Sequence, residues 1–245
     1  MKNKITMESV LFKAIDILET LKIDYWVTDG TLLGIVRENR ILPWDSDVDL
    51  GVWKSEISSL EIIETLKAHG FNYIEVLPVT DSLRFKIDDV HLDINMYSEH
   101  DGETSVKWAS NPLGKVDKLI VQITSKIFEN DKRSPKNNKE KDPAAIFAIR
   151  YVLFLVAFFL TKRMREKIYE FARSRYLYIG TAYPTKLMST KTIVFKQKEI
   201  RVPVKSEEYL KLTYGDDWQI ANRDYIWEED TANLKAFKYK SKKSF

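Results

Sequence analysis

The sequence predicts an α/β (α+β) fold, because segments with helical and with strand periodicity alternate along its first hundred residues. Near the N-terminus, apolar residues recur at helical spacing on one face, namely Leu11, Ala14, Ile15, Leu18 and Leu21. Residues 45–53 and 83–97 instead alternate between apolar and polar side chains, as strands do. We expect the first helix to pack on the sheet that these strands form.

The next elements lie between residues 25 and 71. "YWVTDG" indicates a short strand ending at Gly30, and "TLLGIVRENR" indicates a helix after that glycine, with Thr31 as its cap. A strand, a small-residue turn and a helix N-terminus together present free backbone N–H groups to a phosphate. A further helix is predicted within 55–71, closed by Gly70.

Two pairs of strands complete the pattern. "LRFKIDDVHLDINMY" (83–97) predicts a hairpin that turns at Asp88 and Asp89 and places His91, Asp93 and Asn95 on its polar face. "IVFKQKEIRVPV" (193–204) alternates like a second strand pair. After it, "KSEEYLKLTYGDDW" predicts a helix that runs from a Ser206 cap to a stop at Gly215.

The middle of the chain suggests an insertion. A helix is predicted over 116–127, and the loop-like stretch "ENDKRSPKNNKEKDP" follows. We therefore predict a catalytic core over 1–130, a polar linker with an apolar and basic helical insertion over 131–180, and a strand pair and helix over 181–245 that complete the core.

Residues 144–176 are the most apolar part of the chain. Their longest unbroken apolar run, 151–160, has ten residues, fewer than the ~20 that a spanning helix needs, and a cluster of basic residues follows. A buried helix hairpin is the expected structure. A helix lying on an anionic membrane and a true membrane span are the alternatives.

The composition excludes several kinds of catalytic and binding site. The formal net charge is only +3, from 39 basic and 36 acidic residues, so no global field favours a nucleic-acid partner. The chain has no cysteine and three scattered histidines, which excludes thiol nucleophiles and cysteine–zinc sites and argues against a histidine metal site. Charged residues interrupt the apolar N-terminus, which argues against a signal peptide and for a cytoplasmic protein.

Carboxylates remain as the candidate chemistry. Asp47 and Asp49 point the same way from one predicted strand, and Asp93 lies on the polar face of another. Three such groups could give oxygen-only coordination to one or two Mg²⁺ ions, or to Mn²⁺ in their place, and such ions stabilise displacement at phosphorus. A solvated turn and a structural Ca²⁺ loop are the alternatives for the aspartate cluster alone.

The combination of motifs resembles one family. "DGTLLGIVRENRILPWDSDVDL" resembles the Gly-Thr-Leu-Leu-Gly-x-x-Arg and Pro-Trp-Asp-x-Asp-[Ile/Val]-Asp segments of the LicD and fukutin-related phosphotransferases, within the nucleotidyltransferase fold superfamily. "HLDINMY" is similar to that family's third-carboxylate strand, and "VFKQKEIRVPVKSEEYLKLTYGDDW" to its C-terminal signature. Residues 98–180 show hardly any likeness. The resemblance implies a polymerase-beta-like fold with a mixed sheet flanked by helices.

The resemblance also implies a reaction and roles for site residues. The reaction is transfer of a phosphocholine, phosphoethanolamine or phosphopolyol group from a CDP-activated donor to a hydroxyl of a surface glycan, such as a lipopolysaccharide or teichoic acid, that can be lipid-linked. Asp47, Asp49 and Asp93 would bind the metal, and Asp93 could also accept the acceptor's proton. The other matching positions, assigned to donor binding, are Gly30, Thr31, Arg37 and Asp45.

Several assignments have plainer alternatives. Arg37, expected in the first turns of its helix, could be a surface residue instead of a phosphate ligand. Lys86 could offset donor phosphate charge or be an ordinary solvated lysine. Trp44 could stack on a base, but we expect it in the core, where tryptophan usually lies.

Two other functions fit parts of the pattern. The first is a nucleotidyltransferase, which would add a nucleoside monophosphate from an NTP to a small hydroxylated molecule. It stays open because the spacing of the carboxylates does not say which phosphorus of the donor is attacked. A non-catalytic module could bind a glycan or a membrane, with residues 144–176 as its peripheral membrane contact.

Overall fold

The computed structural model describes residues 5–54, 59–74, 80–112 and 174–237, together with a few single positions between 114 and 171. The chain divides into two compact units. One unit takes its described residues from Met1–Val76, Thr80–Trp108 and Ile179–Lys235, and it holds every residue of the candidate site. The predicted domain bounds at 130 and 180 stay a prediction.

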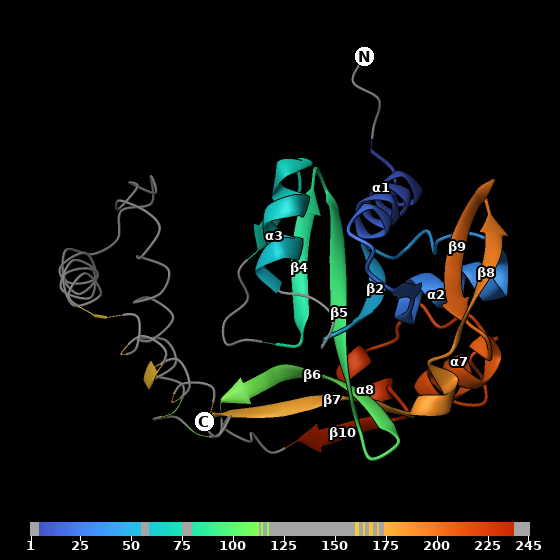
Figure 1. Ribbon diagram of the computed structural model, residues 1–245. Helices are drawn as coiled ribbons and strands as arrows, with labels where there is room; N and C mark the ends of the chain where they lie inside the picture. Colours follow the sequence, from blue (N-terminus) through green and yellow to red (C-terminus); the bar gives the residue numbers. More distant parts are fainter. Residues whose placement is uncertain are drawn as a thin grey trace, which may run out of the picture. The chain divides into compact units, whose positions relative to one another are not determined.

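A mixed sheet flanked by helices forms the core of this unit, which confirms the predicted fold class (Figure 1). Its strands run in the order β1-β2-β5-β6-β7-β10, and β4 pairs with β5 on a branch that β3 extends. The strand bounds are Tyr25–Val27 (β1), Asp47–Trp53 (β2), Asn72–Ile74 (β3), Ser82–Ile87 (β4), Val90–His100 (β5), Glu103–Pro112 (β6), Tyr176–Pro184 (β7) and Leu234–Phe237 (β10).

The described helices are α1 (Met7–Thr20), α2 (Asp29–Glu38), α3 (Ser59–Ala68), α7 (Ser206–Tyr214) and the short α8 (Trp227–Asp230), with a 3-10 turn η1 over Thr185–Leu187. All the described α-helices except the short α8 bury apolar residues. α1 packs on β2, β5 and α3 (Figure 1), as its predicted apolar face requires, and buries Leu11, Ala14, Ile15 and Leu18.

Two hairpins confirm the alternating segments. β4 and β5 turn at Asp88, whose φ of 48° is left-handed. β8 (Thr190–Phe195) and β9 (Lys198–Pro203) form a separate two-stranded sheet. Gly70 follows α3 and Gly215 ends α7, as predicted, and both have a positive φ.

Both predicted helix caps are wrong. α2 begins at Asp29 with Thr28 as its N-cap, and β1 has already ended at Val27, so Thr31 lies in the first turn of the helix. Thr31 Oγ1 instead accepts a hydrogen bond from the Asp49 N–H, which ties α2 to β2 (2.9 Å). Likewise, Ser206 is the first residue of α7, and its hydroxyl donates to the Pro203 carbonyl (2.6 Å).

The predicted insertion falls mostly outside the residues that the structure describes. The helix predicted over 116–127 and most of the apolar segment 144–176 lie outside the described residues. Among the described residues, no helix has the length and apolar character needed to cross a membrane.

Candidate active site

Two neighbouring parallel strands bring the predicted carboxylates together. β2 and β5 pair in parallel with Asp49 opposite Asp93 and Asp47 opposite His91. Asp47 and Asp49 are two residues apart, so their side chains share a face with Asp93. One carboxylate oxygen from each of the three lies within 4.8 Å of the others.

These three residues could hold a divalent metal ion. Their donor atoms are carboxylate oxygens, which Mg²⁺ and Mn²⁺ prefer, and they converge from a rigid pair of strands. Asp49 and Asp93 are largely buried. Burial raises the pKa of Asp49 well above its usual value, and the charges of Asp47, Asp29, Asp93 and Asp45 raise it further. A cation would relieve that repulsion, so the residues fit such an ion.

Asp45 and Gly30 complete one wall of the cluster. A Cβ placed on Gly30 would lie 2.6 Å from Asp45 Oδ2 and 3.6 Å from Asp49 Oδ2. Burial raises the pKa of Asp45 to about 7, and its hydrogen bond with Asp47 and the charge of Asp47 act in the same direction. The first turn of α2 therefore lies directly against the carboxylates, and a side chain at position 30 would require Asp45 to shift.

Asp29 is a further carboxylate that the sequence reasoning missed. It begins α2 with a left-handed φ of 46°. Asn95 Nδ2 donates to Asp29 Oδ2 (3.1 Å), and the Tyr209 hydroxyl donates to Oδ1 (3.4 Å). Burial raises the pKa of Asp29 to about 7. No local pattern distinguishes this Asp-Gly pair from an ordinary turn, so the sequence carried little signal for it.

A buried hydroxyl network joins α7 to the floor of the site. The Tyr209 hydroxyl bonds Thr28 Oγ1 and also lies 3.2 Å from the Tyr97 hydroxyl. The Tyr183 ring stacks on the Tyr209 ring with centroids 4.4 Å apart. Tyr209 on α7 thus holds Thr28, the N-cap of α2, although the two residues are 181 positions apart in the chain.

Arg84 is the second residue that was missed. Its Nε donates to Asp93 Oδ1 (2.8 Å) and Oδ2 (3.2 Å), and its Nη2 donates to Oδ2. These hydrogen bonds to the Asp93 carboxylate raise the pKa of Arg84 above its usual value. A signal did exist, because a hairpin turning at Asp88 and Asp89 places Arg84 directly opposite Asp93, the register that the strands adopt.

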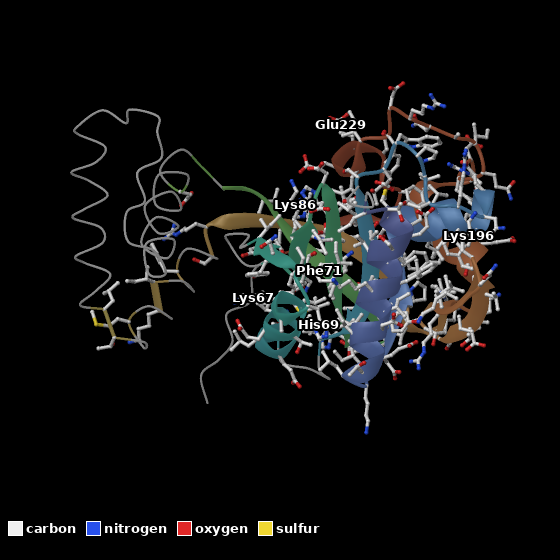
Figure 2. All side chains as sticks on the ribbon, turned by 90° about the horizontal axis from the view of Figure 1, so that it is seen from above. Lys67, His69, Phe71, Lys86, Lys196 and Glu229 are labelled. Carbon is white, nitrogen blue, oxygen red and sulfur yellow. The ribbon has the colours of Figure 1, made fainter. Side chains whose placement is uncertain are left out.

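Two predicted donor ligands, Arg37 and Lys86, each have an ionic partner in the structure. Arg37 is in the last turn of α2 and not in its first turns, about 10 Å along the helix axis from Gly30. It donates to Glu38 (2.8 Å) and to the Trp218 carbonyl (3.3 Å). Lys86 on β4 lies 3.8 Å from the exposed Asp89. Figure 2 shows Lys86 on the side of this unit away from Lys67 and His69.

Trp44 is not a core residue, contrary to the expectation. Its side chain is 36% exposed, and the Arg223 guanidinium lies 5.0 Å from its ring centroid. It follows Pro43 in a turn that leads into β2, so it sits on the surface beside the carboxylate strand and not beneath it.

Comparison with known proteins finds a family match over part of the chain. Residues 22–112 match the family described as LicD/FKTN/FKRP, nucleotidyltransferase domain. These residues form a LicD-family domain. All three cluster carboxylates, Asp29 and Arg84 lie inside it.

The LicD-family match extends to curated relatives over part of the chain. It is 37% identical over 54 residues to human "Ribitol 5-phosphate transferase FKRP", covering 22% of this chain and 11% of that protein. It is 31% identical over 139 residues to human "Ribitol-5-phosphate transferase FKTN", covering 50% of this chain and 28% of that protein. The chain thus spans less than a third of the length of these relatives.

Two solved structures of remote sequence also match this chain. The lincosamide antibiotic adenylyltransferase LnuA, lincomycin-bound, is 15% identical, with a TM-score of 0.43 over 89% of this chain and 96% of that one. The antibiotic-resistance factor ANT(2'')-Ia is also 15% identical, with a TM-score of 0.34 over 68% and 91%.

Proposed function

We propose that this protein is a divalent-metal-dependent phosphotransferase. On this proposal it moves a phospho-substituent from a CDP-activated donor to a glycan hydroxyl. The convergence of Asp47, Asp49 and Asp93 carries the proposal, because it occurs inside a segment that matches the LicD-family domain. The names of the relatives favour ribitol phosphate as the substituent, with phosphocholine, phosphoethanolamine and other phosphopolyols as alternatives.

On this proposal, residues of this chain would bind the metal ion, face the donor's phosphates and border the phosphate site. Asp47, Asp49 and Asp93 would hold the Mg²⁺ or Mn²⁺, which when bound neutralises phosphate oxygens and polarises the phosphorus. The first turn of α2, at Gly30 and Thr31, would face the donor's phosphates with its free N–H groups. Asp45 would border that phosphate site.

The bond changes follow from the proposed donor. The acceptor hydroxyl attacks the phosphorus that carries the substituent, forming an acceptor O–P bond. The bridging P–O bond breaks, and CMP leaves. Asp93 takes the hydroxyl proton, which requires Arg84 to release at least one of its oxygens.

Arg37 and Lys86 have a smaller part in this proposal. Arg37 would need to leave Glu38 to reach a phosphate, and Lys86 would need to leave Asp89. Their roles in donor binding stay predictions. A peripheral membrane contact through 144–176 likewise stays a prediction, and it would place the enzyme beside a lipid-linked acceptor.

A product assay tests the proposal. CDP-ribitol, CDP-choline, CDP-ethanolamine and CDP-glycerol are first screened with Mg²⁺ for protection against thermal unfolding, since a ligand at 100 times its Kd adds ~2.7 kcal/mol. The protecting donor is then incubated with glycan acceptors, and ³¹P NMR follows the products. We expect CMP and a new phosphodiester with the wild type and neither with Asp49→Asn. Pyrophosphate released from an NTP, with nucleotide on the acceptor, would overturn the proposal in favour of a nucleotidyltransferase.

A further inference from the structure

Arg84 and Asp93 form a two-point ion pair at the edge of the carboxylate cluster. They are direct cross-strand partners in the antiparallel pair β4 and β5. The guanidinium contacts both carboxylate oxygens, Nε at 2.8 and 3.2 Å and Nη2 on Oδ2. This is the fork geometry in which arginine binds planar oxyanions.

Asp93 has a negatively charged neighbour on one side and a positively charged neighbour on the other. Across β2–β5 it faces Asp49, and across β4–β5 it faces Arg84. A metal ion held by the cluster would need an oxygen of Asp93, which the guanidinium already contacts. Arg84 and the cation therefore compete for the same oxygens.

The two side chains differ in how readily they can move. The Asp93 side chain is 10% exposed and belongs to a central strand, whereas the Arg84 side chain is 43% exposed. A partly exposed arginine can turn its guanidinium while its stem stays on the strand, at little cost in buried area. When a cation takes Asp93, Arg84 is thus the partner that leaves.

We infer that Arg84 is an exchangeable counter-ion: it neutralises Asp93 in the metal-free protein and moves to a donor phosphate oxygen once a divalent cation replaces it. A phosphate bound by that cation lies beside Asp93, within reach of the released guanidinium. Phosphate accepts the same two-point contact as carboxylate, so the exchange keeps both hydrogen bonds. The inference rests on the proposed function for the identity of the phosphate compound.

A purely structural ion pair is the alternative, and the chain offers a matched example. Arg201 on β9 donates to Asp24, and its side chain is 39% exposed. The register of β1 on β2 pairs Tyr25 with Val52 and Val27 with Leu50, so Asp24 lies at the end of β1 away from Asp47. Arg201→Gln therefore removes an arginine–aspartate pair whose arginine is similarly exposed, although its aspartate is 68% exposed, without touching the cluster.

Two binding measurements test the exchange on the full chain. Mn²⁺ binding is followed by electron paramagnetic resonance without nucleotide, and pyrophosphate binding by calorimetry at saturating Mn²⁺. For Arg84→Gln we expect the Mn²⁺ Kd to fall at least threefold, because the competing cation is gone, and the pyrophosphate Kd to rise at least tenfold. Arg84→Lys keeps the charge without the fork, so its pyrophosphate Kd should be intermediate. Arg201→Gln should match the wild type in both.

The outcomes separate this inference from the proposed function. An Arg84→Gln protein that binds Mn²⁺ no more tightly than the wild type, or pyrophosphate equally well, overturns the exchange. If both constants move as expected while no CDP-linked donor yields CMP, the exchange stands and the proposed function fails. Thermal unfolding of each variant checks the fold, and Arg84→Lys supplies the decision if Arg84→Gln does not fold.

Discussion

Asp49 and Asp93 face each other as register partners across the parallel strands β2 and β5. Two largely buried carboxylates in that position repel each other unless a positive charge lies between or beside them. In the metal-free protein, Arg84 supplies such a charge to Asp93. The two aspartates therefore respond differently to neutralisation.

Asp49→Asn should stabilise the metal-free protein. The substitution removes a buried charge whose pKa is raised first by burial and then by its neighbours, so we expect the free energy of unfolding to rise by roughly 1 kcal/mol. Asp93→Asn should instead lower it by up to about 1 kcal/mol, because Arg84 loses a partner and is itself partly exposed. Denaturant unfolding in EDTA measures both changes. Equal effects of the two substitutions would contradict this account.

Stability of the metal-free protein should depend on pH through Asp29. Burial raises its pKa to about 7 in the folded state, above the ordinary value of 3.8. The folded state then holds the proton more tightly, so this contribution is fully present below about pH 4 and is lost as pH rises through 7. Asp29→Asn should flatten the decline in unfolding free energy between pH 5 and 8, leaving the part due to Asp45 and Asp49. An unchanged slope in the variant would show that Asp29 does not titrate in this range.

The sequence predicted the strands of the site better than its helix starts. Alternation in 45–53 places Asp47 and Asp49 on one face, and alternation in 83–97 places Asp93 on the polar face of its own strand. The parallel pairing that brings the two strands together is seen in the structure and does not follow from alternation. Cap positions depend on one or two residues. Thr28 and Thr31 are both plausible caps by composition, and the hydrogen bond from Asp49 to Thr31 is a tertiary contact that no local pattern reveals.

Side-chain contacts between residues far apart in the sequence were harder to predict. The Tyr209 hydroxyl contacts Asp29, which lies 180 positions earlier in the chain. The family-like C-terminal signature that contains Tyr209 does not indicate which atom this hydroxyl contacts. Arg37 was misplaced because the helix starts two residues earlier than predicted and its guanidinium is held by Glu38. Arg84, by contrast, could have been paired with Asp93 from the hairpin turn alone.

Gly30→Ala should damage the site more than the fold. Its new methyl group would meet Asp45 Oδ2 at 2.6 Å, a side-chain atom that can shift at the expense of the cluster's geometry. We expect turnover to fall about tenfold or more, which corresponds to ~1.4 kcal/mol in the barrier. Gly34→Ala is the control, because its methyl group would meet the Arg40 carbonyl at 2.6 Å, a backbone atom, and should lower the unfolding temperature instead. Normal turnover by Gly30→Ala would remove position 30 from the site.

Tyr209→Phe tests whether α7 supports the active site. The substitution deletes the hydroxyl that reaches Thr28 and Asp29, and we expect a loss of about 1 kcal/mol in stability together with a severalfold lower kcat. Tyr183, whose ring stacks on Tyr209, has a buried hydroxyl that bonds Thr213 Oγ1 (2.9 Å), and Tyr183→Phe deletes it. This variant should lose similar stability without the loss of kcat. Comparable kcat values for the two variants would mean that the network serves folding alone.

A Mn²⁺ titration followed by electron paramagnetic resonance is the most direct test of the carboxylate cluster as a metal site. It needs neither donor nor acceptor, and it compares the wild type with Asp47→Asn, Asp49→Asn and Asp93→Asn. Each variant should keep its fold and bind Mn²⁺ at least about tenfold more weakly, a loss of ~1.4 kcal/mol or more per ligand. Wild-type affinity in all three variants would contradict the assignment of these residues to a metal.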